Sequence, residues 1–177
     1  MKYELVVFDW DGTLLDSTGA IVRAIQAACA DLDLPVPSRA QASHVIGLGL
    51  GDAMRHAVPD LKPENYQAMI ERYRFHYLSG DHELSLFAGV PQMLARLQAA
   101  GHVLAVATGK SRRGLDHVLE SKELHGVFDG SRTADETAGK PHPQMLNELM
   151  EQWGIEPERT LMIGDTTHDL QMAVLAG

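Results

Sequence analysis

The sequence has a single cysteine, Cys29, and no long apolar run. One cysteine excludes an intrachain disulfide and favours a reducing compartment. A membrane-spanning helix needs roughly 18 or more apolar residues in a row, and the chain begins with MKYE, without the apolar segment of a signal peptide. The sequence therefore predicts a cytoplasmic protein that has no membrane partner.

Basic residues are also scarce. Lysine and arginine together number 15, against 24 aspartates and glutamates, so the formal net charge is −9. This balance argues against nucleic acid as a partner, because phosphate backbones bind basic surfaces. It is compatible with a small phosphorylated substrate, because a bound divalent cation reverses the local field. The length of 177 residues suits one domain, or one domain with a small insertion.

Three short apolar runs predict buried strands at residues 5–8, 103–108 and 161–163, and a weaker candidate covers 128–133. Continuous rather than alternating apolar residues are typical of parallel strands covered on both faces. Apolar residues at helical spacing lie between these runs. The alternation predicts an α/β fold, a Rossmann-like parallel sheet with helices on both faces.

Residues 16–84 break this alternation, because they contain no strand candidate. Two helical faces occur there instead, within residues 21–32 and 66–77. We therefore expect an all-helical domain at 16–84, inserted into an α/β core made of residues 1–15 and 85–177.

Four polar clusters follow the predicted strands or open a helix: DWDGT at 9–13, TGKS at 108–111, GKP at 139–141 and GDTTHD at 164–169. In an open α/β sheet, ligands bind just beyond the carboxyl ends of the strands. One sheet would therefore bring all four clusters to the same edge. Singly, each cluster has a structural explanation, such as a turn former, a helix cap or a solvated lysine. Their joint occurrence in this order favours a reaction centre.

The residue types suit the chemistry of a phosphate monoester. Asp9, beside a cation, is a candidate nucleophile toward phosphorus. Asp11 is placed to protonate the leaving alcohol and then to deprotonate the attacking water. Asp9 and Asp165 offer the oxygen ligands that Mg²⁺ prefers. The sequence thus predicts a magnesium site that shields a carboxylate nucleophile from a phosphate anion.

A second set of residues is predicted to hold the transferring oxygens. Lys140 supplies a positive charge, and Thr108 supplies a hydroxyl group. The backbone N–H groups of Gly109 and Lys110 are further candidate donors to phosphate.

The clusters FDWDGT, ATGKS, GKPHP and IGDTTHD resemble, in order, the four signature motifs of the haloacid dehalogenase-like hydrolase superfamily. The resemblance is closest to the phosphoglycolate phosphatase-like branch, which has a helical cap after the first motif. It implies that Asp9 becomes an aspartyl-phosphate, that Asp11 is the general acid/base, and that Thr108 and Lys140 hold the phosphate.

The same resemblance implies that Mg²⁺ is bound by Asp9, Asp165 and the backbone carbonyl of Asp11, while Asp169 supports the metal or Lys140. The cap would close over the substrate and select it. The glycine-rich run at 47–51 lacks the dinucleotide-binding spacing, and one interpretation makes it a cap loop that faces the substrate. Arg112 and Arg113 are expected at an exposed helix start.

Two features depart from the family pattern. Trp10 stands where the family often has a smaller apolar residue, and we expect it to pack in the core. Family members also continue for some tens of residues beyond the fourth motif, adding an edge strand and a final helix, whereas this sequence stops at Gly177. It is expected to be either a truncated or a natural short form.

The predicted function is magnesium-dependent hydrolysis of a small phosphate monoester, with phosphoglycolate as the default substrate. The alternatives are a sugar-phosphate mutase or pyrophosphatase on the same scaffold, or a non-catalytic module that binds a phosphorylated ligand. The sequence does not identify the substrate or the oligomeric state.

Overall fold

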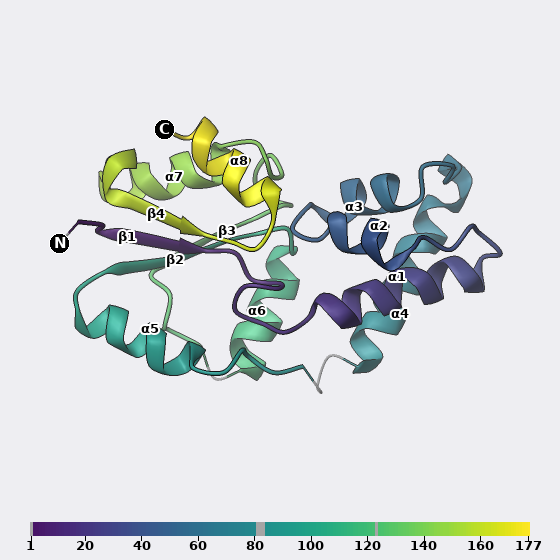
Figure 1. The fold of residues 1–177 in the computed structure, drawn as a ribbon, viewed down its shortest axis with the longest axis horizontal. Helices are drawn as coiled ribbons and strands as arrows, with labels where there is room; N and C mark the ends of the chain where they lie inside the picture. Colours follow the sequence, from purple (N-terminus) through teal and green to yellow (C-terminus); the bar gives the residue numbers. More distant parts are fainter. Residues whose placement is uncertain (1, 81–83, 123) are drawn as a thin grey trace.

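The computed structural model describes residues 2–80, 84–122 and 124–177. A parallel sheet lies at one end of the molecule, and a group of helices lies at the other (Figure 1). The strands are β1 (Leu5–Phe8), β2 (Val103–Thr108), β3 (Gly130–Thr133) and β4 (Thr160–Ile163). The four strands confirm the sequence prediction, although β3 begins two residues later than expected.

The sheet has the order β3-β2-β1-β4, and every neighbouring pair is parallel. Phe8, the last residue of β1, is in register with Val106 of β2 and Ile163 of β4. The strands therefore end at a common edge. Because β1 lies inside the sheet, the residues that follow it have a neighbouring strand on each side.

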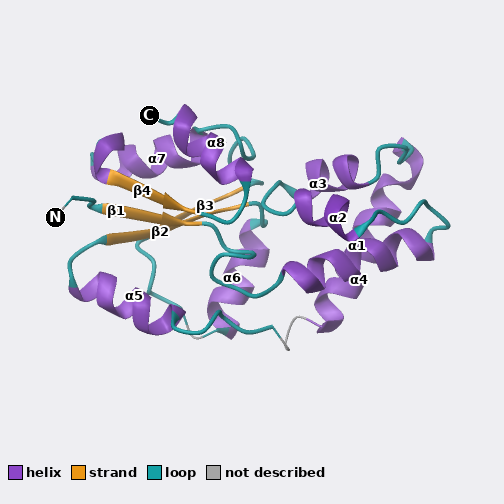
Figure 2. Ribbon diagram, viewed as in Figure 1, coloured by secondary structure: helices purple, strands orange, loops and turns teal. Residues whose placement is uncertain are grey.

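Helices cover both faces of the sheet, as predicted (Figure 2). Helices α5 (Val90–Ala99) and α6 (Arg112–Ser121) pack on one face, where Val6 and Phe8 point. Helices α7 (Gln144–Trp153) and α8 (Thr167–Leu175) pack on the other, where Leu5 and Val7 point. Alternate residues of a strand face opposite ways, so an all-apolar β1 contributes to two hydrophobic clusters at once.

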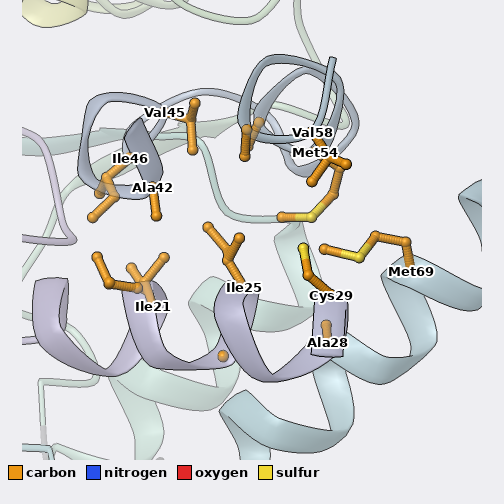
Figure 3. Packing of buried hydrophobic residues seen from close by; sticks show 14 of the residues in the cluster. Ile21, Ile25, Ala28, Cys29, Ala42, Val45, Ile46, Met54, Val58 and Met69 are labelled. Atoms are coloured by element: carbon orange, nitrogen blue, oxygen red, sulfur yellow. The ribbon is translucent and has the colours of Figure 1, made fainter. Parts of the chain in front are cut away.

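The segment between β1 and α5 folds as a helical insertion, which comprises α1 (Thr18–Asp31), α2 (Arg39–His44), α3 (Leu50–Ala57), the short 3-10 helix η1 (Pro63–Asn65) and α4 (Tyr66–Gly80). It has its own apolar cluster, in which Ile25 and Cys29 of α1 pack against Met54 of α3 and Met69 of α4 (Figure 3). No strand occurs in the part of the insertion that the structure describes, residues 16–80 and 84. The exact domain boundaries at 15/16 and 84/85 remain a prediction.

Among the described residues, no helix combines the length and the apolar composition that crossing a membrane requires.

Candidate active site

Four segments that are far apart in the sequence meet at the carboxyl edge of the sheet. Asp9 follows β1, Thr108 ends β2, and Asp165 lies two residues beyond β4. Lys140 comes from the segment between β3 and α7. The parallel register of the strands explains this convergence, because it aligns the points at which the chain leaves each strand.

Lys140 lies between two buried carboxylates. Its Nζ donates to Asp9 Oδ1 at 2.5 Å and to Asp169 Oδ1 at 2.6 Å, and all three side chains are almost fully buried. Burial lowers the pKa of Lys140, but the charges of Asp9 and Asp169 outweigh it and hold the pKa above its ordinary value. The two carboxylates therefore favour the charged form of Lys140.

Asp9 has one carboxylate oxygen without a partner. Its Oδ2 is buried and accepts no hydrogen bond from the described residues. Burial, with the negative charges of Asp169 and Asp11, raises the pKa of Asp9 from 3.8 to about 7, although Lys140 partly offsets the rise. A buried polar atom without a partner is costly. Its presence here is consistent with a ligand or metal contact at this oxygen.

Gly12 allows the first motif to approach Asp165 closely. Its φ is +88°, a conformation that side chains disfavour, and a Cβ built on it would lie 2.3 Å from Asp165 Oδ2. Thr13 Oγ1 donates to Asp165 Oδ1 at 3.1 Å. The Asp165 side chain reaches solvent, yet partial burial still raises its pKa. A larger residue than glycine at position 12 would separate the first and fourth motifs.

The Asp11 carboxylate is held on both sides. Ser17 Oγ donates to its Oδ1 at 2.7 Å, and Lys110 Nζ lies 3.1 Å from its Oδ2. Lys110 Nζ also donates to the hydroxyl of Tyr77 in α4, at 3.2 Å. Asp11 is thereby connected through Lys110 to the helical insertion.

The predicted phosphate-binding loop lies under the helical insertion. Thr108 is buried, and its Oγ1 accepts from the backbone N–H of Lys110 at 3.2 Å, so a phosphate would share that donor. A Cβ built on Gly109 would lie 2.3 Å from the carbonyl oxygen of Leu48 and 2.6 Å from that of Gly47. The glycine-rich run at 47–51 therefore does face the predicted site.

One group of acids among the described residues could hold a metal ion. It consists of Asp9, Asp165 and Asp169, whose candidate ligand atoms lie within 4.8 Å of one another. Asp169 is already engaged, because Oδ1 accepts from Lys140 and Oδ2 accepts from the hydroxyl of Thr166 at 2.7 Å. Asp9 and Asp165 therefore have the most free oxygen lone pairs. The Asp11 side chain is not part of this group. The family resemblance assigned only the backbone carbonyl of Asp11 to the metal.

Trp10 and the arginines after the second motif were also placed from the sequence. Trp10 is fully buried and packs edge-on against Phe128 with ring centroids 6.2 Å apart, as predicted. Arg112 and Arg113 lie at the start of α6, as predicted, and Arg113 is exposed. Arg112 is only partly exposed and donates to both carboxylate oxygens of Glu136, because the start of α6 lies beside the end of β3.

Sequence reasoning missed the partners that orient the motif residues, namely Thr13, Ser17 and Tyr77. Thr13 and Ser17 lie within or just after the first motif, so their hydroxyl groups were detectable as candidates. Nothing in the sequence marks Tyr77, because its contact depends on how the helical insertion lies on the sheet.

A family model described as haloacid dehalogenase-like hydrolase matches residues 6–177. The chain belongs to this family. A phosphoglycolate phosphatase of Aliivibrio fischeri is 36% identical to this hydrolase, over 98% of its chain and 81% of the relative's. The probable phosphatase IndB of Dickeya dadantii is 39% identical, with coverage of 98% and 77%.

A solved structure supports the same assignment. The crystal structure of a predicted phosphoglycolate phosphatase from Haemophilus somnus superposes on this haloacid dehalogenase-like hydrolase with a TM-score of 0.87. The sequences are 26% identical, and the match covers 100% of this chain and 83% of the other. The combination of sheet and inserted helices is therefore the fold of the family.

Proposed function

We propose that the protein is a magnesium-dependent phosphatase that hydrolyses a small phosphate monoester through an aspartyl-phosphate. The observation that carries the proposal is the unpartnered, buried Oδ2 of Asp9, beside the Lys140 ammonium group and the Asp165 carboxylate. A buried carboxylate with one open oxygen and a fixed cation is suited to attack phosphorus.

The reaction then has two displacements. Asp9 Oδ2 forms a bond to phosphorus as the bond from phosphorus to the leaving oxygen breaks, and Asp11 gives its proton to that oxygen. Asp11 next takes a proton from water, whose oxygen attacks the phosphorus of the aspartyl-phosphate and frees Asp9 and inorganic phosphate. Ser17 and Lys110 keep the Asp11 carboxylate in place for both proton transfers.

The remaining motif residues hold the transferring group. Thr108, Lys140 and the backbone N–H groups of Gly109 and Lys110 would bind its oxygens, since they lie at the same sheet edge. Lys140 has a second role, because its position between Asp9 and Asp169 fixes the nucleophile. Asp169 supports this arrangement through its contacts with Lys140 and Thr166.

The donor set fits Mg²⁺, which prefers carboxylate and carbonyl oxygens. Asp9, Asp165 and the backbone carbonyl of Asp11 would hold the ion. When bound, it neutralises charge between the phosphate and the carboxylates.

The substrate suggested first by the relatives is phosphoglycolate or a similar metabolite. We assign catalysis to residues 1–15 and 85–177, and substrate enclosure to a cap formed by residues 16–84. The contact of Gly47 and Leu48 with Gly109 supports this division, because it lays the helical insertion on the phosphate loop.

The test is phosphate release from phosphoglycolate, with and without Mg²⁺, by the wild type and by Asp9→Asn. We expect Asp9→Asn to lower kcat by about 10³-fold or more, the scale of losing a covalent nucleophile. Asp60→Asn is the matched control, because Asp60 is exposed in the loop after α3. Phosphatase activity that survives Asp9→Asn would refute the assignment of Asp9 as the nucleophile. Transfer of the phosphoryl group to another substrate molecule, without release of free phosphate, would favour a mutase.

A further inference from the structure

A large cavity separates the helical insertion from the sheet edge. Its volume is about 1020 Å³, and Asp11, Gly109 and Lys110 form the wall nearest the proposed reaction centre. Pockets for drug-sized ligands measure about 300–1,000 Å³. The cavity is thus about as large as the largest of these pockets, and it borders Asp11, Gly109 and Lys110 of the first two motifs.

Most of the opposite wall is apolar. Leu48 and Leu50 of the glycine-rich run and Ile70 of α4 contribute accessible aliphatic surface. Tyr73 of α4 contributes a partly exposed ring, which stacks on the buried ring of Tyr77 with centroids 5.8 Å apart. Such a wall binds a leaving group by burying its apolar surface and by contact with aromatic rings. Glycolate, a two-carbon acid, offers almost no apolar surface to bury.

The cavity also contains unneutralised positive charge. Arg74 of α4 and Arg113 of α6 both line it, and both are exposed. Within residues 2–80, 84–122 and 124–177, neither has an ion pair or a side-chain hydrogen bond.

The acids of the same cavity, in contrast, are engaged. Asp11 pairs with Lys110, Asp52 pairs with Arg55, and Asp135 accepts hydrogen bonds from Thr133 and from the backbone N–H at the start of α6. The arginines are therefore available to an anionic group of a ligand.

We propose that the preferred substrate is a phosphate monoester whose alcohol carries a ring-sized, partly apolar body and a second negative charge. The body would occupy the wall formed by α4 and the glycine-rich run, and the charge would meet Arg74 and Arg113. This inference rests on the proposed phosphatase function and names its substrate class.

Three substrates separate the two recognition features. Phosphoglycolate has the second charge without the ring, benzyl phosphate has the ring without the charge, and 4-carboxybenzyl phosphate has both. All three release a primary alcohol, so leaving-group reactivity differs little among them. With saturating Mg²⁺, we expect kcat/KM for 4-carboxybenzyl phosphate to exceed each of the others by at least tenfold.

Variants then test whether Arg74 and Arg113 recognise the carboxylate of the substrate. Arg74→Met and Arg113→Met should each reduce the ratio of kcat/KM between 4-carboxybenzyl and benzyl phosphate by at least threefold, and the double variant should bring it close to one. Arg96→Met is the matched control and should keep the ratio, because Arg96 is exposed on α5 and does not line the cavity.

The outcomes separate the two proposals. If phosphoglycolate is hydrolysed in an Asp9-dependent manner and as efficiently as either ring ester, the substrate class is refuted while the phosphatase function stands. A carboxylate advantage below threefold, or one that survives the double arginine variant, refutes the role of the arginines. If the wild type hydrolyses none of the three substrates, both proposals fail.

Discussion

At the scale of single residues, the protonation of Asp9 links stability to metal binding. Its pKa is raised from 3.8 to about 7, first by burial and then by its acidic neighbours. An acid with a raised pKa contributes stability that is present below the unfolded pKa and is lost as the pH rises through the folded pKa. In the metal-free protein, ionising Asp9 therefore reduces stability between about pH 4 and pH 7.

Magnesium should restore that stability, because it binds the ionised carboxylates. At about 100 times Kd, a ligand stabilises a protein by about 2.7 kcal/mol, which corresponds to a rise in Tm of roughly 5–10 °C for a chain of this size. We expect this rise at pH 8, and a much smaller rise at pH 5, in thermal unfolding followed by circular dichroism.

Asp165→Asn should remove most of the rise at pH 8, whereas Asp60→Asn should keep it. An equal rise at pH 5 and pH 8, or a full rise in Asp165→Asn, would show that the ion binds elsewhere.

The convergence of the motif residues was predictable, because their positions after parallel strands limit where they can lie. Asp9, Lys140 and Asp165 meet as their spacing along the predicted strands indicates. Their polar partners were harder to predict. Ser17 is a candidate from its place just after the first motif, but the sequence does not show that its hydroxyl group contacts Asp11, and nothing in the sequence marks Tyr77. The direction of a side chain depends on loop geometry that periodicity does not encode.

At the scale of elements, Arg112 and Glu136 join the start of α6 to the segment after β3. The hydrogen bond from Arg112 is the main cause that lowers the pKa of Glu136 from 4.5 to about 2, and Thr133 contributes a further bond. The depressed pKa means that the stabilising effect is present above about pH 4.5 and is lost as the pH falls toward 2.

Glu136→Gln should therefore be less stable than the wild type at pH 6, by up to about 1 kcal/mol because the pair is partly exposed to solvent. The difference should shrink steadily between pH 4.5 and pH 3 in urea denaturation. Glu120→Gln, at an exposed position of α6, should match the wild type throughout this range. A difference for Glu136→Gln that is constant with pH would contradict the assignment.

Whether a segment is a helix or a strand was easier to predict from the sequence than the contacts between these elements. The runs at 5–8 and 103–108 are strands because a fully apolar segment is buried on both faces of a covered sheet. The short β3, Gly130–Thr133, contains a glycine, a serine and an arginine, so its apolar signal was weak. Pairing beside β2 stabilises it, and that pairing is a tertiary effect.

At the scale of the whole molecule, the helical insertion approaches the core at Gly109. A methyl group at this position would lie 2.3 and 2.6 Å from two backbone carbonyl oxygens, which cannot rotate away as a side chain would. The approach therefore needs glycine at position 109. How the insertion lies on the core could not be predicted, because the four motifs specify only the sheet edge.

Gly109→Ala should push the helical insertion away from the sheet. We expect KM for any substrate to rise at least threefold, and the free energy of unfolding to fall by about 1–3 kcal/mol, the usual cost of overpacking. Small-angle X-ray scattering should show a larger radius of gyration.

Gly80→Ala is the control, because a Cβ at Gly80 would meet no atom of the described residues within 4 Å. It should leave all three quantities close to those of the wild type. If Gly109→Ala also behaves like the wild type, the close approach at Gly109 does not limit the position of the insertion.

The interior position of β1 has a consequence for how the protein is made. Thr13 and its hydrogen-bond partner Asp165 are 152 positions apart. At about 5–20 residues per second, a ribosome needs roughly 8–30 s to synthesise the stretch between them. During that interval the β4 side of β1 has no partner, and an unpaired strand edge is prone to aggregation. The reaction centre is then among the last parts of the molecule to form.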